Sequence, residues 1–169
     1  MEVGVVERPA VERGEYAGFW LRFGANIIDG IIIGIPTGII SVIVSIFWSG
    51  AMMELQESTI DPNYEASLSD IFVFMAGAII ILFLSLLISF LYYTLLHSSK
   101  WQGSVGKILL NIKVTDLNGG RIGFGRATGR YFATIISGMI FYIGYIMAGF
   151  TSKKQALHDM IAGTVVVKK

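Results

Sequence analysis

Two apolar segments of this chain are long enough to cross a lipid bilayer, and they constrain its fold more than any other feature. The first covers about residues 19–48 and the second about residues 71–96, which contain no charged side chain. A helix needs roughly 20 apolar residues to span the hydrocarbon layer. A third uncharged segment, residues 132–150, is 19 residues long. In a chain that is 54% hydrophobic, these segments predict an integral membrane protein built mainly from helices.

Three polar residues, Arg22, Asn26 and Asp29, lie on one helical face inside the first apolar segment. A charge at membrane depth costs at least ~2.5 kcal/mol, so it has to face a partner, a bundle interior or a water-filled cavity. Two roles fit this pattern. Arg22 and Asp29 are a structural lock between helices, or Asp29 binds and releases a cation or proton. Because seven residues span about 10 Å, either Arg22 reaches deep into the segment or Asn26 or water bridges the pair.

The charges that flank the apolar segments predict the orientation of the chain. Residues 49–70 carry five acidic side chains and no lysine or arginine, whereas basic residues precede the first segment and follow the second. Because basic residues gather on the cytoplasmic side, the N-terminus and residues 97–131 are expected in the cytoplasm of a multi-pass plasma-membrane protein. Residues 1–17 are expected to form a polar tail without a cleavable signal. Residues 18–167 are expected to form a single membrane domain.

The third apolar segment either crosses the membrane once or enters and returns. A single crossing puts the four lysines that follow it outside, against the charge rule. Residues 108–115 and 164–168 are typical of β-strands, and Asn-Gly-Gly at 118–120 is typical of a turn. Short strands need partners, so the tail and this region are expected on one side. The sequence therefore favours a broken or re-entrant helical hairpin over residues 126–150, a small cytoplasmic β element and cytoplasmic termini.

Gly30, Gly34 and Gly38 recur every four residues in the first apolar segment. A stripe of small residues lets a second helix approach closely. We therefore expect this face to pack against another helix, and the chain to form a homo-oligomer.

His158 and Asp159 lie in a short amphipathic segment near the C-terminus. Asp159 is expected to hold the tail in place by pairing with Arg22, Arg126 or Arg130. Because histidine titrates near pH 6.5, pH sensing is an alternative role for His158.

Arg126 and Arg130 are four residues apart on a predicted helix. We expect them first to bind headgroups of anionic lipids at the inner leaflet, where each contact is worth roughly 1 kcal/mol. Pairing with Asp29 or Asp159 is the alternative.

Several function classes are not expected. The chain has no cysteine, so thiol catalysis and cysteine metal sites are excluded. Residues 103–107 have the wrong spacing for a phosphate loop, and no cluster of catalytic or metal-ligating residues has usable spacing. We expect no enzymatic activity, no cofactor, no metal and no nucleic-acid partner.

Three motifs in this order resemble those of the RDD family of small membrane proteins, named for one arginine and two aspartates. Arg22 and Asp29 stand in LRFGANIIDG, Gly-Ser-Val-Gly-Lys covers residues 103–107, and Ala-Leu-His-Asp opens residues 156–166. The resemblance covers about residues 16–167 and makes Asp159 the second aspartate. It implies ion transport, since cation/proton antiport has been proposed for members, or a membrane scaffold, since other proteins use RDD-like regions in that way.

The expected function is transport of a small ion or solute, most concretely exchange of a cation for a proton at Asp29. Arg22, Asn26, Asp29 and Asp159 are expected to form one polar cluster on the cytoplasmic side. One arginine between two carboxylates leaves a negative centre unless a proton, a cation or another arginine joins. The alternative is a non-transporting scaffold, or a lipid- or protein-interaction module, in which these residues form a structural lock.

Overall fold

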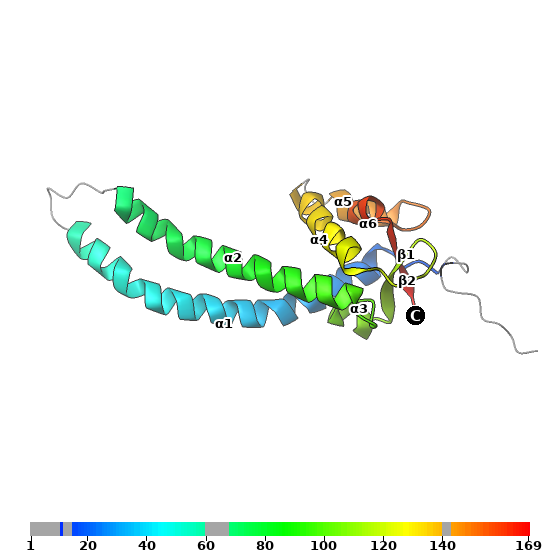
Figure 1. Ribbon diagram of the computed structural model, residues 1–169, viewed down its shortest axis with the longest axis horizontal. Helices are drawn as coiled ribbons and strands as arrows, with labels where there is room; N and C mark the ends of the chain where they lie inside the picture. Colours follow the sequence, from blue (N-terminus) through cyan, green and yellow to red (C-terminus); the bar gives the residue numbers. More distant parts are fainter. Residues whose placement is uncertain (1–10, 12–14, 60–67, 140–142) are drawn as a thin grey trace, which may run out of the picture. The chain divides into compact units, whose positions relative to one another are not determined.

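The computed structural model describes residues 11, 15–59, 68–139 and 143–169, and these are mostly helical. The elements follow one another along the chain as shown in Figure 1: α1 (Phe19–Thr59), α2 (Leu68–Ser98), α3 (Val105–Leu109), β1 (Ile112–Asp116), α4 (Phe124–Met139), α5 (Ile143–Ile146), a 3₁₀ turn (Met147–Gly149), α6 (Leu157–Ala162) and β2 (Thr164–Lys168). The described residues divide into two compact units. One contains residues up to Gly30 together with Phe90–Lys169, and the other is Ile31–Ser89.

The second unit consists of α1 from Ile31 onward and α2 up to Ser89, and these two helices lie side by side (Figure 1). Gly77 of α2 lies against the indole of Trp48 in α1, because a Cβ at Gly77 would be 2.9 Å from the indole nitrogen. Most large apolar side chains of these helices are exposed, including Phe47 at 82%. Both helices contain stretches long and apolar enough to span a membrane, Phe19–Ser49 and Met75–Ser98. Their outward apolar faces are those of lipid-facing helices.

The third apolar segment is not a straight span. α4 and the α5 region together have the length and composition of a span, but they are bent by 115° across residues 140–142, which lie outside the described residues. The predicted fold class is therefore confirmed. It has two long apolar helices, a shorter broken helix pair and a small β element.

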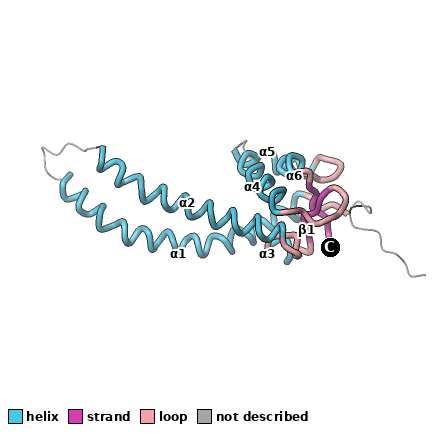
Figure 2. Tube along the Cα trace, in the orientation of Figure 1, coloured by secondary structure: helices cyan, strands magenta, loops and turns pink. Residues whose placement is uncertain are grey.

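The sheet has two antiparallel strands in the first unit, where Figure 2 shows both the strands and the long loops. Ile112 of β1 lies opposite Lys168 of β2, and Asp116 lies opposite Thr164. On its other side β2 pairs with the chain before α1, since the Ala17 N–H donates to the Val166 carbonyl (2.8 Å). β2 therefore has neighbours on both sides, which explains its uninterrupted apolar run.

The predicted strand at residues 108–115 begins too early. Residues 105–109 form α3, and β1 starts only at Ile112. A short apolar run fits a helix and a strand equally well, and packing on α1 decides for the helix. The turn at residues 118–120 forms as predicted, with Gly119 at φ 86° and Asp116 accepting the Gly120 N–H (2.7 Å). It leads to α4, and the partner of β1 is supplied by the C-terminal strand.

The core of the first unit is small and lies between the sheet, α1 and α4. Its members are all buried: Ala17, Ala25, Ile112, Val114, Ile122, Ala127 and Val166. The alanines let α1 and α4 approach the strands closely.

Candidate functional site

Asp29 is fully buried and held by donors from α2 and α3. Its Oδ1 accepts hydrogen bonds from the Tyr92 hydroxyl (2.7 Å) and from the Gly106 N–H (2.7 Å). Its Oδ2 accepts one from the Ser104 hydroxyl (2.5 Å) and lies 3.9 Å from the Lys107 ammonium. Lys107 also donates to Ser104 Oγ (3.2 Å). Both oxygens of this carboxylate are therefore occupied.

Gly106 makes this arrangement possible. A Cβ at this position would lie 2.2 Å from the Ala25 carbonyl oxygen and 2.9 Å from Asp29 Oδ1. Only a glycine lets the backbone of α3 lie directly on α1 and donate to the carboxylate. The motif at residues 103–107 is thus a carboxylate-binding turn.

Asp159 is the second fully buried carboxylate. Arg130 donates to its Oδ1 from Nη2 (2.7 Å) and Nε (3.0 Å), and Arg22 Nη1 forms an ion pair with its Oδ2. The Ala156 N–H also donates to Oδ2 (3.1 Å), which caps α6. Burial raises the pKa of Asp159, but the charges of Arg130 and Arg22 outweigh it and hold the pKa well below its usual range. Asp159 is therefore an ionised carboxylate between two arginines.

The expected single cluster is divided in two. Arg22 and Asp29 share a helical face but do not pair, since Arg22 contacts Asp159 and Asp29 contacts Lys107. Asn26 lines the space between them, and within the described residues its side chain makes no hydrogen bond to either carboxylate. The expected negative centre is absent here, because Arg130 and Lys107 both join.

A cavity of about 470 Å³ lies between the two carboxylate sites, within the first unit. Arg22, Lys107 and Arg130 line it, and so do His97 and His158. Much of the remaining wall is aromatic and aliphatic, and no aspartate or glutamate of the described chain lines it. Three cationic side chains therefore border the cavity, and only two carboxylates, Asp29 and Asp159, compensate their charge. The surplus is one positive charge while both histidines are neutral.

His158 is uncharged near neutral pH. Burial lowers its pKa to about 3, and Arg130, Arg22 and Lys107 add to this effect against the opposing pull of Asp159. A pKa this low does not support the pH-sensing role considered for His158. Burial and the nearby Arg130 also lower the pKa of Lys107, to about 8, so this ammonium is protonated at neutral pH.

Three buried polar atoms on the lining side chains have no hydrogen-bond partner within the described part of the chain: Arg22 Nη2, His97 Nε2 and His158 Nδ1. The tautomer of His97 follows from its neighbour. Arg130 Nη1 lies 3.4 Å from His97 Nδ1, and a guanidinium can only donate, so the proton of a neutral His97 is on Nε2. Arg22 and His97 thus present two unused donors.

The two arginines of α4 have different environments. Arg126 is half-exposed, with its side chain at 48%, and lies 3.9 Å from Asp116. Arg130 was expected first at lipid headgroups, but it is buried and takes the alternative role with Asp159. The physical reason is that a buried carboxylate requires a full countercharge.

The glycine stripe is open in the single chain. A Cβ at Gly30, Gly34 or Gly38 would meet nothing within 4 Å. Packing of another helix on this face stays a prediction.

Sequence reasoning missed Tyr92, Ser104, Gly106 and Lys107 as site residues. Tyr92 carries no local signal, because it stands in an aromatic stretch of an apolar helix. The other three stand in the Gly-Ser-Val-Gly-Lys motif. The available signal was the resemblance to the RDD family, which groups this motif with Arg22 and Asp29.

The RDD family model matches residues 16–163. YxaI of Bacillus subtilis (strain 168) is 45% identical over 154 residues, which cover 90% of this chain and 97% of YxaI. YteJ of the same organism, described as an uncharacterized membrane protein, is 29% identical over 158 residues, covering 90% of this chain and 80% of YteJ. YckC of that organism is 26% identical over 161 residues, covering 89% of this chain and 83% of YckC. No solved structure matches the chain.

Proposed function

This chain belongs to the RDD family, and on that premise we propose that it is a non-transporting membrane module whose buried charges form a structural lock around a binding cavity. One observation carries the proposal. All four oxygens of Asp29 and Asp159 are occupied by donors of the chain itself, and the bordering cations outnumber the carboxylates. A cation at Asp29 would have to displace Lys107 or the hydroxyl and amide donors.

The lock connects distant parts of the chain. Arg22 at the start of α1 and Arg130 of α4 both pair with Asp159 of α6, so one carboxylate joins three helices. Removing one partner of a buried ion pair costs ~3–5 kcal/mol, because the other charge stays buried without compensation. The lock thereby holds the walls of the cavity in place.

The proposed orientation puts both termini and residues 97–125 in the cytoplasm of a plasma-membrane protein. The positive-inside rule supports this orientation, and so does the pairing of β2 with β1 and with the chain before α1. We also propose a homo-oligomer, packed through Gly30, Gly34 and Gly38.

Transport of a small ion or solute with proton exchange is the second candidate. The observation in its favour is Lys107, whose pKa burial lowers to about 8 and which lies 3.9 Å from Asp29. An ammonium with such a pKa releases its proton near pH 8 rather than above pH 10, and Lys107 lines the cavity.

Ion flux decides between the two candidates. Wild-type protein and Asp29→Asn are reconstituted into vesicles that contain a pH-sensitive dye, and sodium or potassium gradients are imposed. The lock proposal expects proton movement no faster than in protein-free vesicles for both proteins. Cation-dependent proton flux in the wild type that Asp29→Asn abolishes, at equal protein incorporation, would establish exchange and overturn the lock proposal.

A further inference from the structure

The cavity between the two carboxylate sites has an electrostatic bias. All the charged side chains that line it are positive: Arg22, Lys107 and Arg130. No carboxylate of the described residues lines it. The carboxylates that compensate them are fully buried behind the wall. An anion entering this space meets one positive charge in excess, whereas a cation meets three like charges first.

Two unused donors belong to side chains that line the cavity. Arg22 Nη2 and His97 Nε2 are buried and have no partner among the described residues, and their side chains are more than nine-tenths buried. Buried donors without partners are rare in folded proteins and require an explanation. An oxygen-rich anion supplies the missing acceptors, and charge-assisted hydrogen bonds of this kind are the strong ones.

The volume and the wall indicate more than a small inorganic ion. About 470 Å³ lies within the range of cavities that hold small organic ligands. Phe19, Phe23, Tyr131 and Ile146 contribute apolar surface to the wall. Such a cavity suits a ligand with a charged end and an apolar end.

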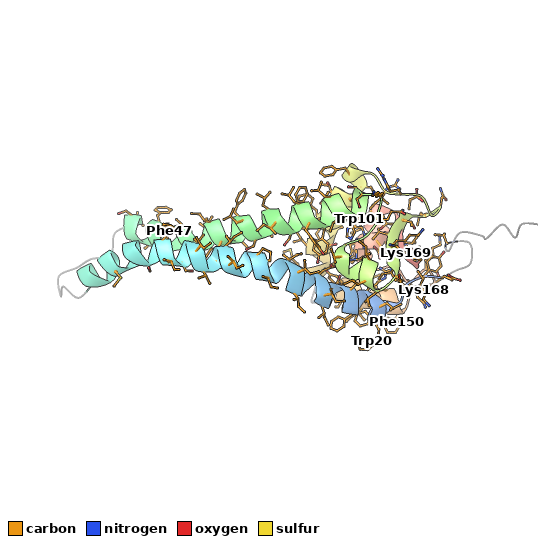
Figure 3. The ribbon with its side chains drawn as sticks, turned by 90° about the horizontal axis from the view of Figure 1, so that it is seen from below. Trp20, Phe47, Trp101, Phe150, Lys168 and Lys169 are labelled. Atoms are coloured by element: carbon orange, nitrogen blue, oxygen red, sulfur yellow. The ribbon has the colours of Figure 1, made fainter. Side chains whose placement is uncertain are left out.

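Exposed aromatic side chains mark one side of the first unit. Figure 3 shows Trp20 and Phe150 projecting outward on the same side, and they are 77% and 86% exposed. Phe19 connects this surface to the cavity, because it lines the cavity, its ring lies 5.2 Å from that of Trp20, and its Cβ lies near Gly149. Tryptophan gathers at the level of lipid headgroups. The cavity wall is thus continuous with a surface suited to the membrane interface.

We propose that this cavity binds a phosphate group, supplied by the headgroup of an acidic phospholipid whose first acyl carbons lie along the aromatic wall. Arg22 and His97 donate to the phosphate oxygens, and Lys107 contributes charge. The inference rests on the proposed lock, which fixes Arg22 and Arg130 at the cavity.

Melting of the full chain in a nonionic detergent tests the site. Three additions are compared: short-chain phosphatidylglycerol, phosphatidylcholine with the same acyl chains, and inorganic phosphate. The proposal expects a saturable rise in Tm with phosphatidylglycerol. The concentration that gives half of this rise should be at least tenfold lower for phosphatidylglycerol than for either other addition. If inorganic phosphate has an equal effect, the cavity binds phosphate but the proposal that a lipid supplies it is wrong. Equal effects of the two lipids, or no effect of any addition, would overturn the proposal.

Two variants locate the binding. Thr134→Trp fills the cavity from α4, where the native hydroxyl donates to the Arg130 carbonyl of its own helix, and should abolish the phosphatidylglycerol shift. Ile136→Trp is the matched control, because Ile136 is exposed on the same helix, and it should keep the shift. His97→Phe removes one unused donor and should weaken lipid binding about tenfold. If both tryptophan variants keep the full shift, the lipid binds elsewhere and the assignment to this cavity is wrong.

The outcomes of this test and of the flux experiment can be told apart. Cation-dependent proton flux would overturn the lock and leave the lipid selectivity as measured. If the protein carries no flux and shows no lipid selectivity, the proposal of a lipid in the cavity is wrong, whereas the lock proposal stands.

Discussion

Replacing Gly106 with alanine should separate α3 from α1 at the Asp29 site. The added methyl would lie 2.2 Å from the Ala25 carbonyl oxygen, well inside contact distance, and 2.9 Å from Asp29 Oδ1. Neither neighbour can move easily, because one is helix backbone and the other is the carboxylate that α3 itself binds. α3 therefore has to shift by roughly 1 Å, which lengthens the 2.7 Å hydrogen bond from the Gly106 N–H.

The expected cost has two parts. Overpacking in a well-packed interior costs ~1–3 kcal/mol. Weakening a hydrogen bond to a charged group costs up to ~1.5–3 kcal/mol more. Together these costs amount to ~2.5–6 kcal/mol, and the helix preference of alanine returns ~1 kcal/mol, so the free energy of unfolding should fall by about 1.5–5 kcal/mol.

Denaturant unfolding of purified protein in detergent measures this effect. Gly129→Ala is the matched control, because a Cβ at Gly129 in α4 meets nothing within 4 Å. The control should be neutral or stabilised by up to ~1 kcal/mol. A Gly106→Ala protein as stable as this control would refute the assignment of the motif at residues 103–107 to carboxylate binding.

Three further predictions concern pH, topology and assembly. The pKa of His158 is about 3 in the folded chain and ~6.5 when exposed, so the unfolded chain takes up a proton between these values. Melting curves should show stability fully present above pH 6.5 and lost as the pH falls, by ~1.4 kcal/mol per pH unit for this proton, and His158→Phe should reduce the slope. A cysteine at Lys168 in this cysteine-free chain should react with an impermeant thiol reagent only from the cytoplasmic side, and labelling from outside would contradict the proposed topology. Gly34→Ile should weaken self-association measured by light scattering in detergent, whereas an unchanged mass would mean that the stripe faces lipid.

The membrane spans could be predicted because bilayer thickness imposes a length that few soluble segments match. Arg22 and Asp29 interrupt an apolar segment and Asp159 stands in a short amphipathic one, so the sequence indicated that each needs a partner, and all three are buried. Their partners were beyond local pattern, because Asp29 meets residues 104–107 and Arg22 meets Asp159 from the far end of the chain. Which segments approach α1 depends on tertiary packing, and helical periodicity does not predict it.

Arg126 and Arg130 illustrate the same limit within one helix. Their spacing of four residues predicts a shared face and a shared role. In the fold, Arg126 is half-exposed beside Asp116 and Arg130 is buried against Asp159. Arg130 belongs to the buried stripe of α4, together with Ala127, Ala133 and Ser137, whereas Arg126 lies outside that stripe. Which face of α4 is buried depends on tertiary packing.

A double-mutant cycle between Arg130 and Asp159 tests the central claim that these residues lock the domain. The free energy of unfolding is measured for the wild type, Arg130→Met, Asp159→Asn and the double variant, and a parallel cycle joins Arg126→Met with Asp116→Asn. The account predicts a coupling energy of at least ~2 kcal/mol for the buried pair and under ~1 kcal/mol for the exposed pair. Equal coupling energies in the two cycles would contradict the lock.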